Sequence, residues 1–219
     1  MSIKGIVFDL DGTLLDTLQS IGAAFNRTLT KMQMPVWDID AYRYFIGEGV
    51  YKCAERCLPE AKRTEETINQ LVELEREDYS KNWKVDAGPY DGIKKVILDA
   101  KSQGYRLAVL SNKDDGFAKQ CVNHYFPDSP FDSIIGYSSS VPHKPDPTGA
   151  GLVARSLGLQ SEELVMVGDT SIDILTAQAC KMYSIGVLWG FRETAELEAA
   201  GADKIIQHPD ELLTTINQF

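Results

Sequence analysis

The sequence predicts an α/β protein in which a parallel β-sheet carries helices on both faces, with a helical domain inserted into it. Short apolar runs rich in Val and Ile alternate with helix-like patterns along most of the chain. Within these runs, apolar residues do not alternate with polar ones, which is typical of parallel strands buried on both faces. Residues 17–85 break this rhythm, since they contain no comparable strand. We therefore expect a helical insertion after the first strand.

The elements follow in order. The first expected strand is KGIVFDL at 4–10, and five more are expected at 105–111, 133–137, 164–168, 183–189 and 204–207. Helices are expected between and after them, at 90–103, 115–125, 148–158, 172–181 and 193–200. Within the insertion, helices are expected at 17–33, about 49–58 and 64–81. The Gly- and Pro-containing stretch DAGPYDG at 86–92 marks the return to the sheet. The expected domains are an α/β core of residues 1–16 and 86–219 and a helical domain of residues 17–85.

Composition excludes several classes of protein. The chain has 219 residues and a formal net charge of -10, with no basic tract to bind nucleic acid. No apolar run approaches the roughly 18 residues of a membrane helix. Asp9 and Asp11 interrupt the region where a signal peptide would need an apolar segment. We expect a cytoplasmic protein that binds neither nucleic acid nor membrane.

The four cysteines leave two interpretations open. Cys53 and Cys57 are four residues apart on an expected helix and could form half of a metal site. No second Cys/His pair completes such a site. Buried thiols that pack as small apolar groups are the simpler interpretation.

Acidic residues gather where the expected strands end. Asp9 and Asp11 close the first apolar run, and two like charges this close require compensation. In an open α/β sheet the carboxyl ends of the strands form one ligand-binding edge. The other polar residues that the sequence assigns to this edge are Ser111, Asn112, Lys144, Asp169 and Asp173. Clustered carboxylates need a cation, and an oxygen-rich set of ligands suits Mg²⁺.

Four motifs in this order carry a resemblance to a known family. DLDGTLLDT, VLSNK, HKPDP and VGDTSID resemble the motifs of the haloacid dehalogenase superfamily, and the match runs over the whole chain. The resemblance implies a Rossmann-like catalytic core with an inserted helical cap domain. It also implies phosphate monoester hydrolysis. The family's dehalogenases lack the second Asp, its sugar-phosphate mutases carry a cap signature absent here, and its transporters need membrane helices.

The resemblance also implies a role for each motif residue. Asp9 is similar to the nucleophile that forms an aspartyl-phosphate, and Asp11 to the general acid and base. Mg²⁺ is implied to bind Asp9, the backbone carbonyl of Asp11, Asp169 and, directly or through water, Asp173. Lys144 is implied to stabilise the nucleophile and the transferring group. The implied phosphate-binding residues are Gly12, Thr13, Ser111, Asn112 and Lys144, with Gly12 permitting a turn that directs backbone N–H groups at the phosphate.

Other interpretations of these residues remain open from the sequence alone. Ser111 could cap the helix expected at 115–125, and Lys144 could be a solvated loop lysine. His143 is interpreted as loop structure because the site already has an acid–base group. Asp16 is left outside the catalytic set, and a non-catalytic phosphate-binding protein is the alternative from a different functional class.

Substrate choice is expected to come from the helical domain. The stretches YRYFIGEGV at 42–50 and 189–213 look like those of phosphoglycolate phosphatases, which makes Gly47, Glu48 and Gly49 candidate substrate contacts. Glu48 departs from the pattern, since its charge disfavours a substrate carboxylate unless Arg43, Lys52 or Arg56 compensates. The expected ligand is a small phosphorylated metabolite, with pyrophosphate, nucleotides and sugar phosphates as alternatives to phosphoglycolate. We expect a monomer or a homodimer.

Overall fold

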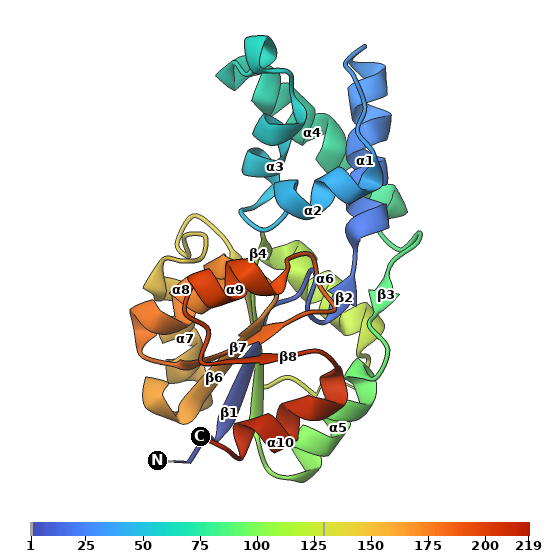
Figure 1. The fold of residues 1–219 in the computed structure, drawn as a ribbon. Coiled ribbons are helices and arrows are strands. Elements are labelled where there is room, and N and C mark those ends of the chain that lie inside the picture. The colour runs from blue at the N-terminus through green and yellow to red at the C-terminus, as the bar shows by residue number, and fades with distance from the viewer. Residues whose placement is uncertain (1, 129) are drawn as a thin grey trace. The chain divides into compact units, whose positions relative to one another are not determined.

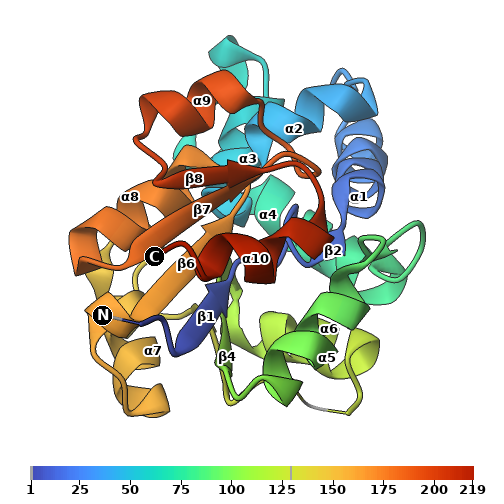
Figure 2. The ribbon, with the colours of Figure 1, turned by 60° about the horizontal axis from the view of Figure 1, so that its bottom comes forward.

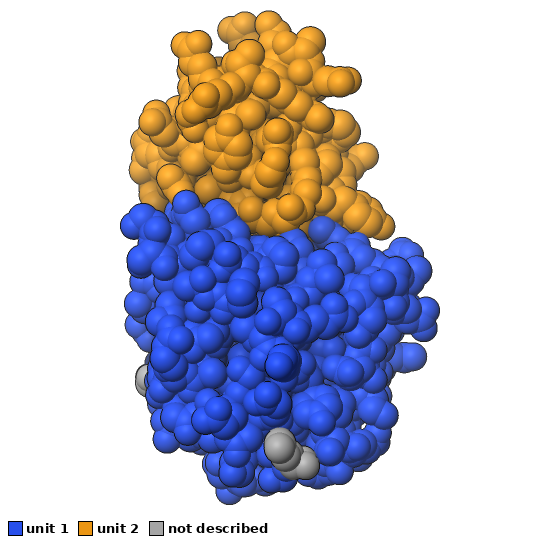
Figure 3. Space-filling view, turned by 90° about the vertical axis from the view of Figure 1, so that its left-hand side faces the viewer, with its two compact units in different colours: residues 1–15, 89–219 blue, residues 16–88 orange. Residues whose placement is uncertain are grey.

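The structure is a computed structural model that describes residues 2–128 and 130–219. The chain divides into two compact units, one of residues 1–15 and 89–219 and the other of residues 16–88. Figure 3 colours these two units separately. No helix among the described residues is long and apolar enough to cross a bilayer.

The first unit is built on a six-stranded sheet in the order β5-β4-β1-β6-β7-β8. Every neighbouring pair of strands is parallel. The strands are β1 (Gly5–Phe8), β4 (Arg106–Asp114), β5 (Ser133–Tyr137), β6 (Leu164–Gly168), β7 (Tyr183–Val187) and β8 (Lys204–Ile206). All residues of β1 and β6 are buried, as their unbroken apolar runs predict. The predicted fold class is confirmed.

Helices cover both faces of this sheet (Figure 2). On one face α7 (Pro147–Leu157) and α8 (Ser171–Cys180) pack with β4 and β6 around Leu110, Val153, Met166 and Ala177. The remaining helices of this unit are α5 (Ile93–Ser102), α6 (Asp115–Tyr125), α9 (Thr194–Ala199) and α10 (Leu212–Ile216), with short 3₁₀ turns at Ser161–Glu163 and Pro209–Glu211. Local sequence explains the bounds of α7, because Asp146 caps its start, Pro147 opens it and Gly158 ends it in the left-handed conformation.

The second unit is mainly helical. Its helices are α1 (Leu18–Lys31), α2 (Tyr42–Phe45), α3 (Val50–Cys57) and α4 (Glu65–Asn82), with 3₁₀ turns at Ile39–Ala41 and Glu60–Lys62. Two short strands, β2 (Leu15–Asp16) and β3 (Gly88–Pro89), form a separate two-stranded sheet where the chain enters and leaves this unit (Figure 1). Cys53 and Cys57 are buried free thiols, and the acidic cluster described below contains no cysteine.

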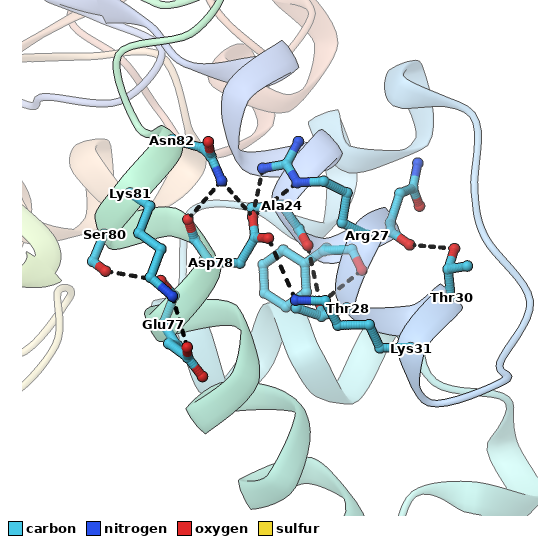
Figure 4. Close-up of polar contacts among 12 residues, drawn as sticks. Ala24, Arg27, Thr28, Thr30, Lys31, Glu77, Asp78, Ser80, Lys81 and Asn82 are labelled. Atoms are coloured by element: carbon cyan, nitrogen blue, oxygen red, sulfur yellow. Dashed lines mark hydrogen bonds and ion pairs between the residues drawn. The ribbon is translucent and has the colours of Figure 1, made fainter.

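A charged cluster joins α1 to α4 inside the helical unit (Figure 4). The Asp78 carboxylate is almost buried and accepts hydrogen bonds from Nε and Nη2 of Arg27 at 2.9 and 2.5 Å. Nζ of Lys31 lies 3.7 Å from the other Asp78 oxygen. Burial would raise the pKa of Asp78, but the hydrogen bonds and charge of Arg27 outweigh it and lower that pKa below its usual value. The ionised carboxylate therefore stabilises the pairing of these two helices.

Candidate active site

Three neighbouring strands deliver the predicted polar residues to one edge of the sheet. In the parallel register Phe8 of β1 lies opposite Val109 of β4 and Val167 of β6. The residues that follow, Asp9 after β1 and Asp169 after β6, therefore leave the sheet at the same level. Ser111 and Asn112 lie in the last part of β4.

Asp9, Asp169 and Asp173 form a compact buried cluster. One carboxylate oxygen from each lies within 4.8 Å of the others. Asp169 and Asp173 are fully buried, and Asp9 is 8% exposed. Asp173 enters the cluster from α8, one helical turn beyond Asp169, as its spacing in the sequence predicts.

Lys144 lies between two of these carboxylates. Its Nζ is 2.8 Å from Oδ1 of Asp9 and 2.6 Å from Oδ1 of Asp173, and its side chain is 4% exposed. Burial alone would lower the pKa of this ammonium, but the neighbouring Asp173 and Asp9 charges outweigh it and raise that pKa. Lys144 is therefore a charged part of the cluster and not a solvated loop lysine.

The carboxylates carry more negative charge than Lys144 can offset. Burial raises the pKa of Asp9 well above its usual range, Lys144 opposes this rise, and the charges of Asp173 and Asp169 add to it. Burial and the Asp173 charge raise the pKa of Asp169 to about 7. A divalent cation bound among the three oxygens would reverse these shifts, because it favours the ionised forms. The residues present thus fit a hard cation with oxygen ligands such as Mg²⁺.

Local hydrogen bonds fix two of the three carboxylates. The second oxygen of Asp173 accepts from the backbone N–H and the hydroxyl of Thr170 at 3.1 and 2.9 Å, which closes a capping box at the start of α8. Asp169 accepts from the Thr13 hydroxyl at 3.0 Å and from the Phe191 N–H at 2.8 Å. Each acid therefore presents a defined oxygen to the cluster.

The loop after β7 supports Asp169, and the motif residues did not predict this role. A Cβ on Gly190 would meet Asp169 and the Gly12 carbonyl closer than any real Cβ approaches its neighbours. Trp189 Nε1 donates to the Thr13 carbonyl at 2.9 Å. The run Trp-Gly-Phe was visible in the sequence, but its contacts with Asp169 are made through the Phe191 backbone and through the absence of a side chain at Gly190.

The loop after β1 uses its own backbone donors internally. The Gly12 N–H donates to the Leu15 carbonyl at 2.8 Å, and the Thr13 N–H is 3.4 Å from the Leu10 carbonyl. Gly12 has a φ of 89°, which permits the turn expected there. Gly12 also gives the Asp169 carboxylate room that a Cβ would fill.

Asn112 and Ser111 make different hydrogen bonds at the carboxyl edge of the sheet. The Asn112 amide donates to the Lys144 carbonyl at 3.2 Å and accepts from the Lys144 N–H at 2.6 Å, so it holds the loop that carries Lys144. Ser111 is 4% exposed, and its Oγ accepts from the Lys113 N–H at 3.2 Å. The N-cap of α6 is Asp114, so Ser111 does not cap that helix.

Asp11 pairs with a lysine that the sequence did not single out. Lys113 Nζ lies 2.8 Å from Oδ2 and 3.0 Å from Oδ1 of Asp11. The two side chains are 9% and 13% exposed. Lys113 follows two polar residues at the end of a strand, a position typical of solvated lysines, and only the fold brings it to Asp11.

Gly47, Glu48 and Gly49 lie in the helical unit, just before α3. Both glycines have positive φ, at 128° and 86°. The Glu48 carboxylate forms an ion pair with Arg56, which also donates to the Phe45 carbonyl at 3.2 Å. Arg56, one of three bases that could compensate Glu48, is thus its partner, whereas Lys52 pairs with Glu55 at 2.7 Å.

Comparisons with known proteins agree with this geometry. The family model for haloacid dehalogenase-like hydrolases matches residues 6–187. A phosphoglycolate phosphatase of Aquifex aeolicus is 31% identical, with 96% of this chain and 95% of that protein covered. A phosphoglycolate phosphatase of Colwellia psychrerythraea is 28% identical over 97% and 96% of the two chains. The structure of a candidate phosphoglycolate phosphatase from Lactobacillus delbrueckii superposes with a TM-score of 0.93 at 28% identity, covering 99% of both chains.

Proposed function

The chain belongs to the haloacid dehalogenase-like hydrolases and is a phosphatase similar to phosphoglycolate phosphatases, and we propose that it hydrolyses phosphate monoesters with Mg²⁺ through an aspartyl-phosphate on Asp9. The observation that carries the proposal is the buried cluster of Asp9, Asp169 and Asp173 around Lys144 at the carboxyl ends of the strands. Such a cluster would bring a nucleophile, a cation site and a fixed positive charge together in one place.

Asp9 is the proposed nucleophile. Its oxygen forms a bond to phosphorus as the bond from phosphorus to the ester oxygen breaks. Lys144, 2.8 Å away, orients Asp9 and stabilises negative charge on the transferring group. Asp9, Asp169, Asp173 and the backbone carbonyl of Asp11 are the proposed ligands of Mg²⁺. When bound, the ion would neutralise the carboxylates and the phosphoryl oxygens as a Lewis acid.

Asp11 is the proposed proton carrier. It gives a proton to the leaving ester oxygen in the first step. In the second step it takes a proton from the water that attacks the phosphorus of the aspartyl-phosphate, and inorganic phosphate leaves. Ser111, Asn112, Gly12 and Thr13 remain the proposed residues around the phosphate, with Asn112 acting through the loop of Lys144.

The proposed substrate is 2-phosphoglycolate or a similarly small phosphate ester. The names of the relatives support this choice. We also propose that residues 17–85 are the cap domain and that Gly47, Glu48 and Gly49 contact the substrate. The Glu48–Arg56 ion pair supports a role of Glu48 near the substrate, because it offsets the Glu48 charge, which would otherwise disfavour a substrate carboxylate.

The test is phosphate release from a panel of esters that includes 2-phosphoglycolate, with Mg²⁺ and with chelator. Asp9→Asn should abolish turnover and leave the circular dichroism spectrum unchanged, because the amide keeps the shape but cannot form the acyl phosphate. Asp91→Asn, at an exposed position, is the matched control and should retain full activity. Substantial turnover by Asp9→Asn, or full turnover in chelator, would contradict the proposal.

A further inference from the structure

We propose that Glu196 is a positioning residue that fixes Asp169 and Asp173 relative to each other and thereby raises the affinity of the acidic cluster for its cation. Glu196 lies on α9, outside the four motifs, and acts through Ser171 and Arg192. The inference rests on the proposed Mg²⁺ site and extends it to a residue behind the ligands. All of these residues lie in the first unit.

Glu196 holds the start of α8. Its Oε1 accepts hydrogen bonds from the backbone N–H and the hydroxyl of Ser171, at 3.0 and 2.7 Å. Ser171 is the first residue of α8, where a helix cannot satisfy its own N–H groups. A carboxylate at this place also interacts favourably with the partial positive charge of the helix terminus. Because Ser171 lies two residues after Asp169 and two before Asp173, its anchoring restrains the backbone of both acids.

The second oxygen of Glu196 is tied to the loop after β7. Nε of Arg192 lies 3.0 Å from Oε2 of Glu196, and the Arg192 side chain is 8% exposed. Arg192 directly follows Phe191, whose N–H donates to Oδ2 of Asp169 at 2.8 Å. Glu196 therefore links the helix that carries Asp173 to the loop that holds Asp169.

These contacts close a ring around Asp169. From Asp169 the backbone leads to Ser171, which is bonded to Glu196. Glu196 pairs with Arg192, and the N–H of the neighbouring Phe191 returns to Asp169. Removal of the Glu196 carboxylate would open this ring at two places. The loop and the start of α8 would then hold their acids less firmly, and groups behind metal ligands act on affinity in this way.

The affinity for Mg²⁺ separates positioning from a purely structural role of Glu196. A ligand that binds the folded state raises the melting temperature by an amount that reports its affinity. Partners behind the ligands typically contribute 10- to 100-fold in metal affinity, and we expect Glu196→Ala to weaken Mg²⁺ binding by roughly tenfold. At Mg²⁺ concentrations well above both dissociation constants, this loss should make the rise in melting temperature about 3–5 °C smaller than in the wild type.

Phosphate release supplies a second measurement. At limiting Mg²⁺, Glu196→Ala should hydrolyse phosphate esters roughly tenfold more slowly than the wild type. At saturating Mg²⁺ its rate should lie within about threefold of the wild type, because the loss concerns binding of the ion and not the reaction that follows.

Matched variants serve as controls. Glu198→Ala removes an exposed carboxylate from the same helix and should keep the wild-type response to Mg²⁺. Ser171→Ala removes one of the two donors to Glu196 and should weaken Mg²⁺ binding less than Glu196→Ala does. The double variant should be no worse than Glu196→Ala, because both substitutions act through one contact.

The outcomes distinguish the inference from the proposed function. If Mg²⁺ does not raise the melting temperature of the wild type, the proposed cation site is wrong and the inference falls with it. If the wild type responds and Glu196→Ala responds equally, Glu196 does not position the cluster, whatever its effect on stability, and the proposed function is unaffected. If Glu196→Ala fails to fold, Glu196→Gln takes its place. Its amide keeps an oxygen for Ser171 but loses the ion pair with Arg192, so it should also weaken Mg²⁺ binding, and a wild-type response would overturn the inference.

Discussion

Replacing Lys144 by Met should destabilise the metal-free protein, because the cluster would lose the ammonium that pairs with two of its carboxylates. In the structure the Lys144 Nζ is bonded to Asp9 and Asp173 at 2.8 and 2.6 Å, and the lysine side chain is 4% exposed. Removing one partner of a buried ion pair costs about 3–5 kcal/mol. Proton uptake by the carboxylates limits the loss, so we expect about 3 kcal/mol.

The expected loss of stability is large enough to measure by thermal unfolding. For a chain of this size 1 kcal/mol shifts the melting temperature by roughly 2–4 °C, so Lys144→Met should melt about 6–12 °C lower. The assay is thermal unfolding followed by circular dichroism in buffer with chelator. Lys95→Met is the matched control, because the Lys95–Asp99 pair has side chains 80% and 42% exposed. It should shift the melting temperature by no more than about 2 °C.

The loss of stability in Lys144→Met should also depend on pH. Without Lys144 the folded-state pKa of Asp9, already raised by burial, rises further. A carboxyl group whose pKa is raised by folding destabilises the folded protein at pH values above the pKa of the unfolded chain, near 3.9. This loss of stability grows until the pH passes the pKa of the folded state. The melting temperature of Lys144→Met should therefore lie slightly below that of the wild type near pH 5 and further below it near pH 8. If Lys144→Met melts at the same temperature as the Lys95→Met control, Lys144 does not stabilise the cluster. The same conclusion follows if the difference in melting temperature from the wild type does not decrease in acid.

Three further results are expected. Gly190→Ala should lower activity by roughly 10- to 100-fold and stability by about 1–3 kcal/mol, because the added Cβ would displace the Asp169 carboxylate. Wild-type kinetics in this variant would show that the loop moves to accommodate the Cβ and leaves Asp169 in place. Asp78→Asn should lower the free energy of unfolding in urea by about 1 kcal/mol at pH 7 and by less as the pH falls below 4. The reason is that the lowered pKa of Asp78 means that only its ionised form stabilises the fold. A loss of stability that does not depend on pH would contradict this. Arg56→Gln should lower kcat/KM for 2-phosphoglycolate several-fold, and Glu48→Gln should raise it. Phosphate esters with an uncharged organic group should change little with either variant, and both effects should be smaller at high salt. Equal changes for both kinds of ester would show that the Glu48–Arg56 pair does not sense substrate charge.

The sequence predicted the strands well because buried parallel strands leave a strong signal. Every expected strand has its counterpart, but β4 extends to Asp114, three residues beyond the apolar run that predicted it. Polar residues at a functional edge can continue a strand without continuing its pattern. The order of the strands, with β1 between β4 and β6, depends on long-range pairing that no local pattern encodes.

The candidate site was predictable where a motif named the side chain and not where a contact crosses the fold. Asp9, Asp169, Asp173 and Lys144 come together at the edge of the sheet to which the sequence assigned them. Lys113 was missed because its partner Asp11 is 102 residues away in the sequence.

Backbone contacts were equally hidden from the sequence. The loop after β7 reaches Asp169 through the N–H of Phe191 and through the missing Cβ of Gly190. Neither feature belongs to a chemically distinctive side chain. The hydrogen bonds of the Asn112 amide to the backbone of Lys144 were likewise not predicted from the sequence.

The stereochemistry at phosphorus shows whether the reaction passes through a covalent intermediate on Asp9. A phosphorothioate ester made chiral at phosphorus with oxygen isotopes is hydrolysed in isotopically labelled water, and the configuration of the released thiophosphate is determined. Transfer to Asp9 and then to water comprises two in-line displacements, each of which inverts the configuration at phosphorus, so a covalent intermediate predicts net retention. Net inversion would mean that water attacks the ester directly and would contradict the role proposed for Asp9.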